Sequence, residues 1–377
     1  MKIAISARML KSVPDDGVSR FTYEIIKRIT LNNPSFRFVL IFDKEFDNNL
    51  IFSPNTEGFV LKPPARHPLL WYYWHEWQLP ALLKKTGADV FLSPDGIISL
   101  RSKIPTVTVI HDINFYHRPK DIPIITRFYY RHFFRKFAQK AVRIVTVSHF
   151  CKNDISSYLN IDPGLIDIAY NGVSEYFTPA DKKETDEFRK ELTGSVPYFL
   201  FVGNFSPRKN IGGVVNAYNR FRNISGMNHK LVLTGGKLFL NRDSDRLIRS
   251  SLWSDDIILT GCKTHEDLRL FYASATSLVF VPWFEGFGIP AAEAMRCGTP
   301  VILSNTTSLP EVGGEAAVYV SPANTEEICS AMIRIAAEED LRITLSEKGI
   351  RESLKFNWDK TAESVLESID KAVSLQL

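Results

Sequence analysis

The sequence predicts an α/β protein with two doubly wound parallel sheets, and three observations support this fold class. Short β-branched and aliphatic runs alternate with helical patterns along the whole chain of 377 residues. The runs are apolar at nearly every position, as in parallel strands that helices cover on both faces. The pattern breaks near residue 173 and then starts again. We therefore expect two domains of roughly 150 to 200 residues.

The predicted strands fall into two groups that the break separates. The first group comprises residues 2–6, 36–42, 89–93, 106–112 and 143–148. The second comprises residues 198–204, 230–236, 257–261, 277–282, 300–304 and 316–320. These groups give a first domain over residues 1–173 and a second over 174–357. The remaining segment, 358–377, carries apolar residues at helical spacing and predicts one amphipathic helix.

Composition indicates an ordinary globular chain. Hydrophobic residues make up 45% and charged residues 23%, and the formal net charge is +4, which excludes disordered and fibrous classes. No apolar run is long enough to span a membrane, and the N-terminal residues resemble a strand more than a signal peptide, so we expect a cytoplasmic protein. The four cysteines lack the spacing of a metal site. The mild basicity suits anionic small molecules or a membrane surface and is too weak to indicate nucleic acid.

Two carboxylates flank a glycine-rich turn in FVPWFEGFGIPAAEAMRCGTPVI, residues 280–302. We expect Glu285 in the loop after a strand and Glu293 in the first turns of the following helix. The N–H groups of Gly288 and Ile289 then lie at a positive helix end, which suits phosphate or sugar hydroxyls. A carboxylate there can accept both hydrogen bonds of a vicinal diol. The alternative is that both glutamates only stabilise the helix N-terminus.

These residues resemble a known family. EGFGIPAAEA (285–294), with VGNFSPRKN (202–210) before it and SNTTSLPEVGGEAAVYVSP (304–322) after it, is similar to the retaining GT-B glycosyltransferases of glycosyltransferase family 4. The two glutamates form the E-x7-E motif of that family, and the resemblance spans nearly the whole chain. It implies two Rossmann-like domains that face each other across a cleft, with the last helix crossing back to the first domain. It also implies that the second domain binds an activated sugar donor and the first domain the acceptor.

The resemblance implies roles for residues of the second domain. Glu293 would hold the ribose diol of the nucleotide, and Glu285 would face the transferred sugar near the β-phosphate. The pocket would be completed by the backbone of Phe287, Gly288 and Ile289. Arg208 and Lys209 would bind the diphosphate and stabilise its growing charge in place of a metal ion; the alternative is a solvated pair near a helix start. Lys263 lies where relatives contact the base through backbone groups. Many relatives also have an arginine where this chain has Asn204.

The first domain contributes two candidates. His111 follows a strand, where open sheets place ligand-facing residues, and the resemblance puts a histidine beside the donor sugar. A structural histidine is the alternative. Asp112 could orient that ring or cap the next turn. Gly17 lies before a helix that we expect Ser19 to cap, where a glycine lets backbone approach the diphosphate, although an ordinary loop glycine is the alternative.

Two further patterns have competing interpretations. The DSD at 243–245 matches the metal-binding motif of a different transferase fold, and we interpret it as a solvated loop. In the segment 127–143, Arg127, Arg131 and Arg135 form a basic stripe beside a Tyr/Phe face. This segment fits either a helix that docks on anionic lipid or a first-domain helix whose aromatic face is core and whose arginines are solvated.

The sequence thus predicts a retaining, metal-independent glycosyltransferase. It would move a hexosyl unit from a nucleoside diphosphate sugar to a hydroxyl of a glycan or lipid-linked glycan, with no other cofactor and with peripheral contact at the inner face of the plasma membrane. PRKN and SLPEVGG resemble mannosyltransferases of surface polysaccharide assembly, so GDP-mannose is the first donor expected and UDP-linked sugars follow. The alternatives are a nucleotide-sugar 2-epimerase and a non-catalytic sugar-nucleotide binder.

Overall fold

The chain forms two compact units. The computed structural model describes residues 1–14, 16–64, 68–236 and 242–375. Unit 1 is Met1–Gly172 together with the segment from Trp358, and unit 2 is Val173–Asn357. Each unit contains one sheet whose neighbouring strands are all parallel, so the predicted α/β class with two parallel sheets is confirmed.

The sheet of unit 1 has seven strands in the order β3-β2-β1-β4-β5-β6-β7. They are β1 (Lys2–Ser6), β2 (Arg37–Phe42), β3 (Thr56–Val60), β4 (Val90–Ser93), β5 (Thr106–Val109), β6 (Arg143–Thr146) and β7 (Ile166–Ile168). Strands β3 and β7 were not predicted. The first carries Glu57 and Gly58 in its middle, and the second is only three residues long, so neither shows an apolar run. Both are edge strands of the sheet.

The helices of unit 1 connect these strands. They are α1 (Gly17–Asn32), α2 (Pro68–Tyr73), the π-helix η2 (Trp74–Gln78), α3 (Leu79–Thr86), α4 (Asn114–His117), α5 (Ile124–Lys140), α6 (His149–Leu159) and α15 (Trp358–Ser374), with short 3-10 turns at Asn48–Leu50, Pro119–Asp121 and Pro163–Leu165. The prediction that Ser19 caps α1 is wrong. Asp16 is the cap: its carboxylate accepts from the N–H of Ser19 at 2.7 Å, and the Ser19 hydroxyl accepts from the N–H of Asp16 at 3.1 Å.

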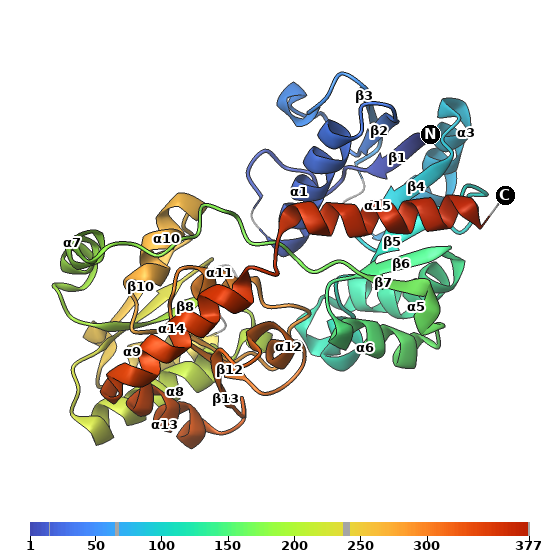
Figure 1. The fold of residues 1–377 in the computed structure, drawn as a ribbon. Helices are drawn as coiled ribbons and strands as arrows, with labels where there is room; N and C mark the ends of the chain where they lie inside the picture. The colour runs from blue at the N-terminus through green and yellow to red at the C-terminus, as the bar shows by residue number, and fades with distance from the viewer. Residues whose placement is uncertain (15, 65–67, 237–241, 376–377) are drawn as a thin grey trace. The chain divides into compact units, whose positions relative to one another are not determined.

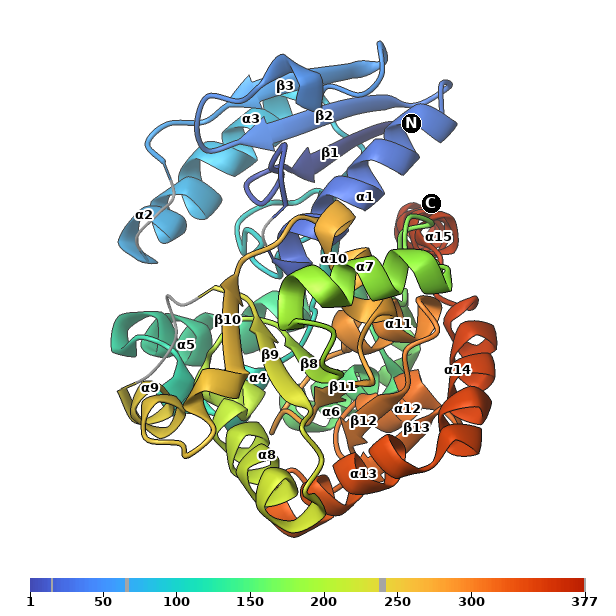
Figure 2. The same ribbon diagram turned by 90° about the vertical axis from the view of Figure 1, so that its left-hand side faces the viewer.

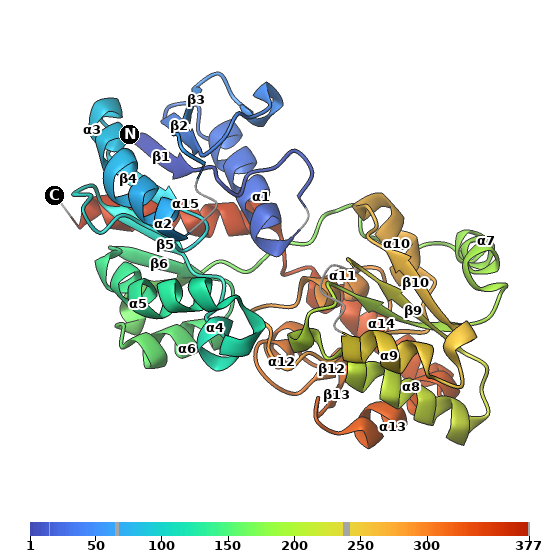
Figure 3. The ribbon, with the colours of Figure 1, turned by 180° about the vertical axis from the view of Figure 1, so that it is seen from behind.

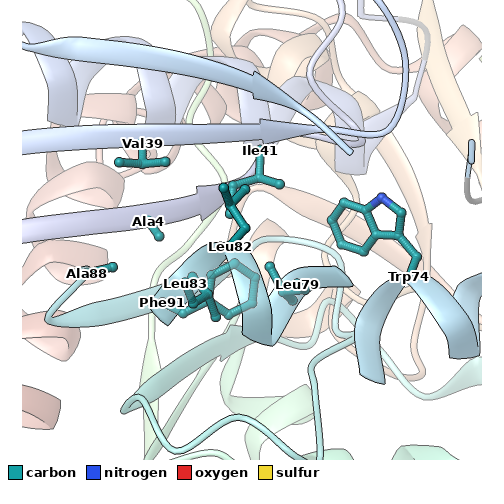
Figure 4. Packing of buried hydrophobic residues seen from close by; sticks show 9 residues of the cluster. All are labelled: Ala4, Val39, Ile41, Trp74, Leu79, Leu82, Leu83, Ala88 and Phe91. Carbon is teal, nitrogen blue, oxygen red and sulfur yellow. The ribbon is translucent and has the colours of Figure 1, made fainter. Parts of the chain in front are cut away.

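One part of the core of unit 1 lies between the sheet and α3. Figure 4 shows Leu79, Leu82 and Leu83 of α3 beside side chains of β1, β2 and β4. Trp74 closes one end of this cluster, is fully buried, and donates from its ring nitrogen to the carbonyl of Leu61 at 3.1 Å. Burial of each such leucine stabilises the fold by roughly 1.5 to 3 kcal/mol.

The last helix packs on unit 1, as predicted. Helix α15 contacts α1 and strands β4, β5 and β6, and Figure 1 shows it alongside them. Val365, Ile369 and Ala372 on its inner face are fully buried. Asp359 accepts from Arg28 of α1 at 2.7 Å. Gly172 lies against the start of the helix, because a Cβ at that position would collide with the backbone and ring of Trp358.

The sheet of unit 2 has six strands in the order β10-β9-β8-β11-β12-β13, which Figure 2 shows from one side. All six were predicted: β8 (Tyr198–Val202), β9 (Lys230–Thr234), β10 (Ile257–Gly261), β11 (Ser277–Phe280), β12 (Val301–Ser304) and β13 (Ala317–Val320). From β8 the chain proceeds to β9 and β10 on one side, and then returns to β11, β12 and β13 on the other. The strand order therefore reverses between β8 and β11, where open α/β sheets bind ligands at the carboxyl ends of their strands.

The helices of unit 2 are α7 (Lys182–Thr193), α8 (Ile211–Ser225), α9 (Arg242–Arg249), α10 (His265–Ala273), α11 (Ile289–Arg296), α12 (Leu309–Gly313), α13 (Thr325–Ala337) and α14 (Glu339–Ser353), with 3-10 turns η5 (Pro207–Lys209) and η7 (Ser254–Asp256). The prediction of a loop at 243–245 is wrong, because these residues lie in α9. Asp245 there forms an ion pair with Arg249, one turn later, at 2.8 Å.

Candidate functional site

A cluster of three charged side chains lies at the strand reversal of unit 2. Turn η5 follows β8 and carries Arg208 and Lys209, while Glu285 follows β11. The Lys209 ammonium donates to Glu285 Oε2 at 2.6 Å, and the Arg208 guanidinium donates to the same oxygen at 2.8 Å. Two cations and one carboxylate leave the cluster with a net charge of +1. The cluster is suited to binding an anion.

Burial makes the ionisation of this cluster depend on its partners. The side chains of Lys209 and Glu285 are 7% and 13% exposed. Burial alone would raise the pKa of Glu285, but the charges of Lys209 and Arg208, with their hydrogen bonds, outweigh it and hold that pKa below its ordinary value. Lys209 also lies over the ring of Phe280, 4.9 Å from its centroid. Glu285 is therefore ionised at neutral pH and keeps both cations beside it.

The turn after Glu285 is fixed by backbone requirements. Gly288 has a φ of +106° and caps α11, and a Cβ there would collide with Leu309, so only glycine fits. The Ser308 hydroxyl donates to the carbonyls of Glu285 and Phe287 at 2.8 and 3.0 Å. Helix α11 begins at Ile289. Pro290 has no N–H, and the N–H groups of Ala291 and Ala292 donate to the carbonyl of the capping residue Gly288 at 2.9 and 3.3 Å. The predicted backbone group Phe287, Gly288 and Ile289 thus surrounds the start of α11.

Glu293 lies further along α11 and is buried. The hydroxyl of Tyr272, on α10, donates to its Oε2 at 2.8 Å, and His265 Nδ1 lies 3.9 Å from its Oε1. Burial and the neighbouring charge of Glu293 raise the pKa of Tyr272 well above its ordinary value, so the phenol stays protonated and remains a donor. Sequence reasoning missed both Tyr272 and His265. His265 could have been suspected from THEDL, a capped helix start after a strand, whereas nothing local marks Tyr272.

The strand that precedes Lys263 is not a neighbour of the two strands that precede the charged cluster. Lys263 follows β10, which β9 separates from β8. Its side chain is exposed, and its ammonium lies 5.6 Å from the ring centroid of Phe271. Asn204, between β8 and turn η5, accepts from the Ser206 hydroxyl at 2.8 Å. Arg208 and Lys209 are thus the side chains that bring positive charge to Glu285.

His111 belongs to unit 1 and follows β5. Its Nε2 donates to the carbonyl of Pro94 at 2.9 Å, and its ring meets the ring of Phe21 edge-on with centroids 4.9 Å apart. Burial lowers the pKa of His111, against the opposing effects of the Pro94 carbonyl and nearby carboxylates including Asp112 and Asp16. The ring is therefore neutral at pH 7, with its proton on Nε2.

Gly17 and Asp112 have defined places in unit 1. Gly17 is the first residue of α1, directly after the capping residue Asp16, rather than a loop residue. Asp16 acts electrostatically on His111, so the start of α1 and the end of β5 lie in the same region of the unit. The Asp112 carboxylate accepts from the N–H of Asn114 at 3.0 Å. Asp112 therefore caps the turn that follows it, which was one of its two predicted roles.

The described part of the chain lacks metal-binding clusters and membrane-spanning helices. No group of three or more His, Cys, Asp and Glu residues there could hold a metal ion. None of the described helices has the length and apolar character needed to cross a membrane. The four cysteines are free thiols, and Cys262 alone among them is exposed.

Two family models match most of the chain between them. The Glycosyltransferase Family 4 model matches residues 16–175, and the Glycosyl transferases group 1 model matches residues 182–352. O-antigen chain mannosyltransferase B of Escherichia coli is 26% identical over 370 residues, which cover 95% of this chain and 97% of that protein. O-antigen chain mannosyltransferase RfbU of Salmonella typhimurium is 28% identical over 285 residues, 75% of each chain.

Solved structures share the fold over nearly the full length. Sucrose-phosphate synthase from Thermosynechococcus elongatus superposes with a TM-score of 0.78 at 18% identity and covers 98% of each chain. Anabaena Alr3699/HepE, solved in complex with UDP and glucose, gives a TM-score of 0.77 at 16% identity and covers 98% of this chain and 100% of that one. At these identities the likeness concerns the fold.

Proposed function

Because the chain belongs to the GT-B glycosyltransferases, with a family 4 domain followed by a group 1 domain, we propose that it transfers a hexosyl unit from a nucleoside diphosphate sugar to a hydroxyl of a glycan or lipid-linked glycan. Mannose is the first sugar proposed and GDP-mannose the first donor. The names of the two O-antigen mannosyltransferases, one of them similar over nearly the whole chain, support mannose and a polysaccharide acceptor. The Anabaena structure with UDP and glucose supports a nucleotide-sugar donor of some kind.

The observation that carries the proposal is the convergence of Arg208 and Lys209 on one oxygen of Glu285 at the strand reversal. A leaving diphosphate gains negative charge as its bond to the sugar breaks, and two fixed cations in a buried site stabilise that charge. Glu285 keeps both cations converged and provides negative charge for the sugar, which becomes cationic as the bond breaks. Side chains thus supply the positive charge, and we propose that transfer needs no metal ion.

The proposed stereochemistry rests on the resemblance to the retaining glycosyltransferases of family 4. We propose retention, with the acceptor hydroxyl attacking on the face that the diphosphate leaves and the departing phosphate taking the acceptor proton. Glu285 then needs no covalent bond to the sugar. Glu293 would bind the ribose diol, with Tyr272 holding its carboxylate in place.

The remaining predicted residues complete the donor site. The backbone at the start of α11 would contact the sugar and phosphate, and the loop of Lys263 would contact the base. From unit 1, the neutral ring of His111 would hydrogen-bond to the sugar, and the start of α1 at Gly17 would approach the diphosphate. Peripheral contact with a membrane is proposed as well, through the basic and aromatic residues of α5. Arg131 and Arg135 of the predicted basic stripe are exposed, whereas the stripe was wrong at Arg127, which is half-buried and donates to the carbonyl of Ile122 at 3.4 Å.

The donor is tested by thermal shift with GDP, UDP, GDP-mannose and UDP-glucose. A ligand present at 100 times its Kd stabilises the folded chain by about 2.7 kcal/mol. We expect the guanosine ligands to raise the melting temperature most. A shift with the uridine ligands alone would exclude GDP-mannose as the donor, and no shift with any of the four would count against a nucleotide-sugar site.

Transfer is tested with the best donor and a mannose-terminated oligosaccharide. The product is expected to have the donor's anomeric configuration by NMR, with the same rate in EDTA as in buffer. An inverted product would exclude retention, and activity abolished by EDTA and restored by Mg²⁺ or Mn²⁺ would exclude metal independence. Release of an epimerised nucleotide sugar without acceptor would support the 2-epimerase. Tight donor binding without turnover on any acceptor would support the non-catalytic binder.

A further inference from the structure

A buried ion pair lies at the strand reversal of unit 1. From β1 the chain proceeds to β2 and β3 on one side of the sheet and then returns to β4 on the other, so β1 and β4 are neighbours at the reversal. Arg8 follows β1 and Asp95 follows β4, and the guanidinium donates to the carboxylate at 3.1 Å. Their side chains are only 8% and 9% exposed. Open α/β sheets bind ligands at the carboxyl ends of strands at such a reversal.

The π-helix η2 adds a fully buried histidine to this pair. His75 Nδ1 lies 2.8 Å from the carbonyl of Trp71, and its Nε2 lies 3.4 Å from the Arg8 guanidinium. Because a carbonyl can only accept, Nδ1 carries the proton and Nε2 accepts from Arg8. Short π-helical segments are rare and occur frequently at functional sites. The group thus contains one cation, one carboxylate and a neutral imidazole, and its net charge is zero.

Two tyrosines of α5 lie near this ion pair. Burial, and next the charge of Asp95, raise the pKa of Tyr130 to about 12. Burial also raises the pKa of Tyr129, on which the charges of Arg8 and Asp95 act, and this side chain is 5% exposed. In the part of the chain that the structure describes, no residue exchanges a hydrogen bond with either hydroxyl. Hydroxyls so little exposed are nearly always hydrogen-bonded, so water or a ligand must be their partner.

Aromatic rings of two further helices lie beside these phenols. Helix α5 contacts both α2 and α4 (Figure 3). The ring centroid of Trp71, on α2, lies 5.4 Å from that of Tyr129 and 6.1 Å from that of Tyr130. Phe115, on α4, lies 4.9 Å from Tyr130 by the same measure. Aromatic faces with a few polar groups among them are typical of small-molecule sites, and the C–H faces of a sugar ring pack well on them.

A pocket adjoins the group at Arg8. Its volume is about 180 Å³, and the segments after β1 and β2 line it, among them Leu10 and Phe46. Sites for drug-sized ligands have roughly 300 to 1,000 Å³, so this pocket suits a single sugar residue rather than a nucleotide sugar. The charged residues of its described lining are three cations and three anions, so the pocket attracts neither sign of charge: Arg8, Lys11 and Lys44, with Asp43, Glu45 and Asp47.

We propose that the Arg8–Asp95 group and the adjoining pocket bind the sugar end of the acceptor and select a neutral sugar. Asp95 accepts from a sugar hydroxyl, Tyr129 and Tyr130 donate to sugar oxygens, and Trp71 packs on the C–H face of the ring. Balanced charges favour such a ligand over an anion, which would meet as many carboxylates as cations. This inference rests on the proposed function and deepens it, because recognition of the acceptor falls on neutral sugar and not on a lipid phosphate.

The test measures acceptor binding and acceptor KM in the full chain. Mannotriose and maltotriose are titrated without donor by NMR, and transfer to the one that binds is measured at saturating donor. Tyr129→Phe and Tyr130→Phe each remove one hydrogen bond, so each should weaken binding and raise acceptor KM about three- to tenfold. Asp95→Asn should do so at least tenfold. Donor KM, and hydrolysis of the donor without acceptor, should stay at wild-type values in all three variants.

Tyr158→Phe is the matched control, because Tyr158 lies on α6 of the same unit and is 50% exposed. This control should bind and react like the wild type. The two tyrosine variants decide the test if Asp95→Asn does not fold. The proposal is overturned if the wild type binds neither trisaccharide, or if the folded tyrosine variants change only in melting temperature.

The choice of a neutral sugar has its own test. The trisaccharide that binds, phosphorylated on its terminal residue, should bind at least tenfold more weakly than the neutral form, and equal or tighter binding would overturn this choice. Failure of the proposed function has a different outcome. If a trisaccharide binds, the tyrosine variants lose that binding and no donor supports transfer, the transferase assignment is wrong while the sugar site stands.

Discussion

Replacement of Lys209 by methionine tests the charged cluster on which the proposed reaction depends. Methionine keeps an unbranched apolar stem, so packing against the Phe280 ring is largely preserved while the charge is removed. The bond that is lost is short and shielded from water, since the ammonium lies 2.6 Å from Glu285 Oε2 and the lysine side chain is 7% exposed. The variant therefore isolates the contribution of one cation.

The expected magnitude follows from that contact. Charge-assisted hydrogen bonds contribute about 1.5 to 3 kcal/mol, so a donor diphosphate that loses this partner should bind roughly 10- to 150-fold more weakly. The free protein should also lose stability, because Glu285 keeps only Arg208 as a cationic partner. Since Lys209 is the first of the groups that lower the pKa of Glu285, the variant should also raise that pKa. The stability that ionised Glu285 contributes above its unfolded pKa, near 4.3, would then be lost at a higher pH than in the wild type.

The assay is calorimetric titration with the preferred nucleoside diphosphate, together with urea unfolding of the free protein. Lys183→Met is the matched control, since it removes an exposed lysine of the same unit, on α7, and should change neither quantity by more than about 0.5 kcal/mol. The double variant Lys209→Met/Glu285→Gln should regain stability relative to Lys209→Met alone, because no buried carboxylate is left short of cations. Unchanged donor affinity in a folded Lys209→Met protein would refute the assignment of this cluster to the diphosphate.

Three further predictions concern other groups. Glu285→Gln should lower kcat on the order of a hundredfold with little change in donor KM, whereas Glu293→Gln should chiefly raise donor KM. If both variants instead raised KM equally and modestly and kept kcat, the assigned roles would be wrong. Tyr272→Phe should raise donor KM about tenfold and leave kcat within about twofold, because it removes the phenol that positions Glu293; a lower melting temperature with unchanged KM would indicate a purely structural role. Burial, and next the charge of Arg8, lower the pKa of the fully buried His75 to about 3, whereas its pKa in the unfolded chain is about 6.5. The stability that the neutral His75 ring contributes is therefore lost as the pH falls below about 6.5. Urea unfolding should show a loss of about 2 kcal/mol from pH 7 to pH 5 that His75→Gln largely removes, and an equal loss in both proteins would contradict this source.

The fold was predictable wherever a strand is buried on both faces. Such strands are continuous apolar runs, and the four inner strands of unit 2, β9, β8, β11 and β12, are of this kind. The edge strands β10 and β13 are only partly buried, but each still begins with apolar residues and was predicted. Edge strands need no such run, which is why β3, with Gly58 in its middle, and β7 were missed. The cap of α1 was misplaced because Asp16 and Ser19 are both good capping residues, and the two bond each other reciprocally.

The candidate site was predictable one motif at a time. Arg208 and Lys209 were selected from one loop and Glu285 from another, but their direct ion pairs join residues 76 positions apart or more and depend on β8 lying beside β11. The partner of Glu293 was missed for the same reason. Tyr272 lies in an ordinary amphipathic helix, and only the packing of α10 near α11 brings its hydroxyl to the carboxylate. A local sequence motif predicts which residue types belong to a site. The contacts between segments far apart in the sequence can be predicted only once the strand order is known.

The position of α15 has a consequence for how the protein is made. Unit 1 needs this helix to cover its β4–β6 region, yet the ribosome delivers Trp358 only after all of unit 2 has emerged. At about 5 to 20 residues per second, Val173–Asn357 takes roughly 10 to 40 s to synthesise. Synthesis of unit 2 starts after that of unit 1, yet unit 2 is the first whose whole sequence has been synthesised. The two ends of unit 2 lie together, because the N–H of Val173 donates to the carbonyl of Phe356 at 3.1 Å. During that interval the apolar surface of unit 1 that later packs against Val365, Ile369 and Ala372 is exposed to solvent. We expect chaperones to bind unit 1 there, and aggregation to be most frequent at this stage of synthesis.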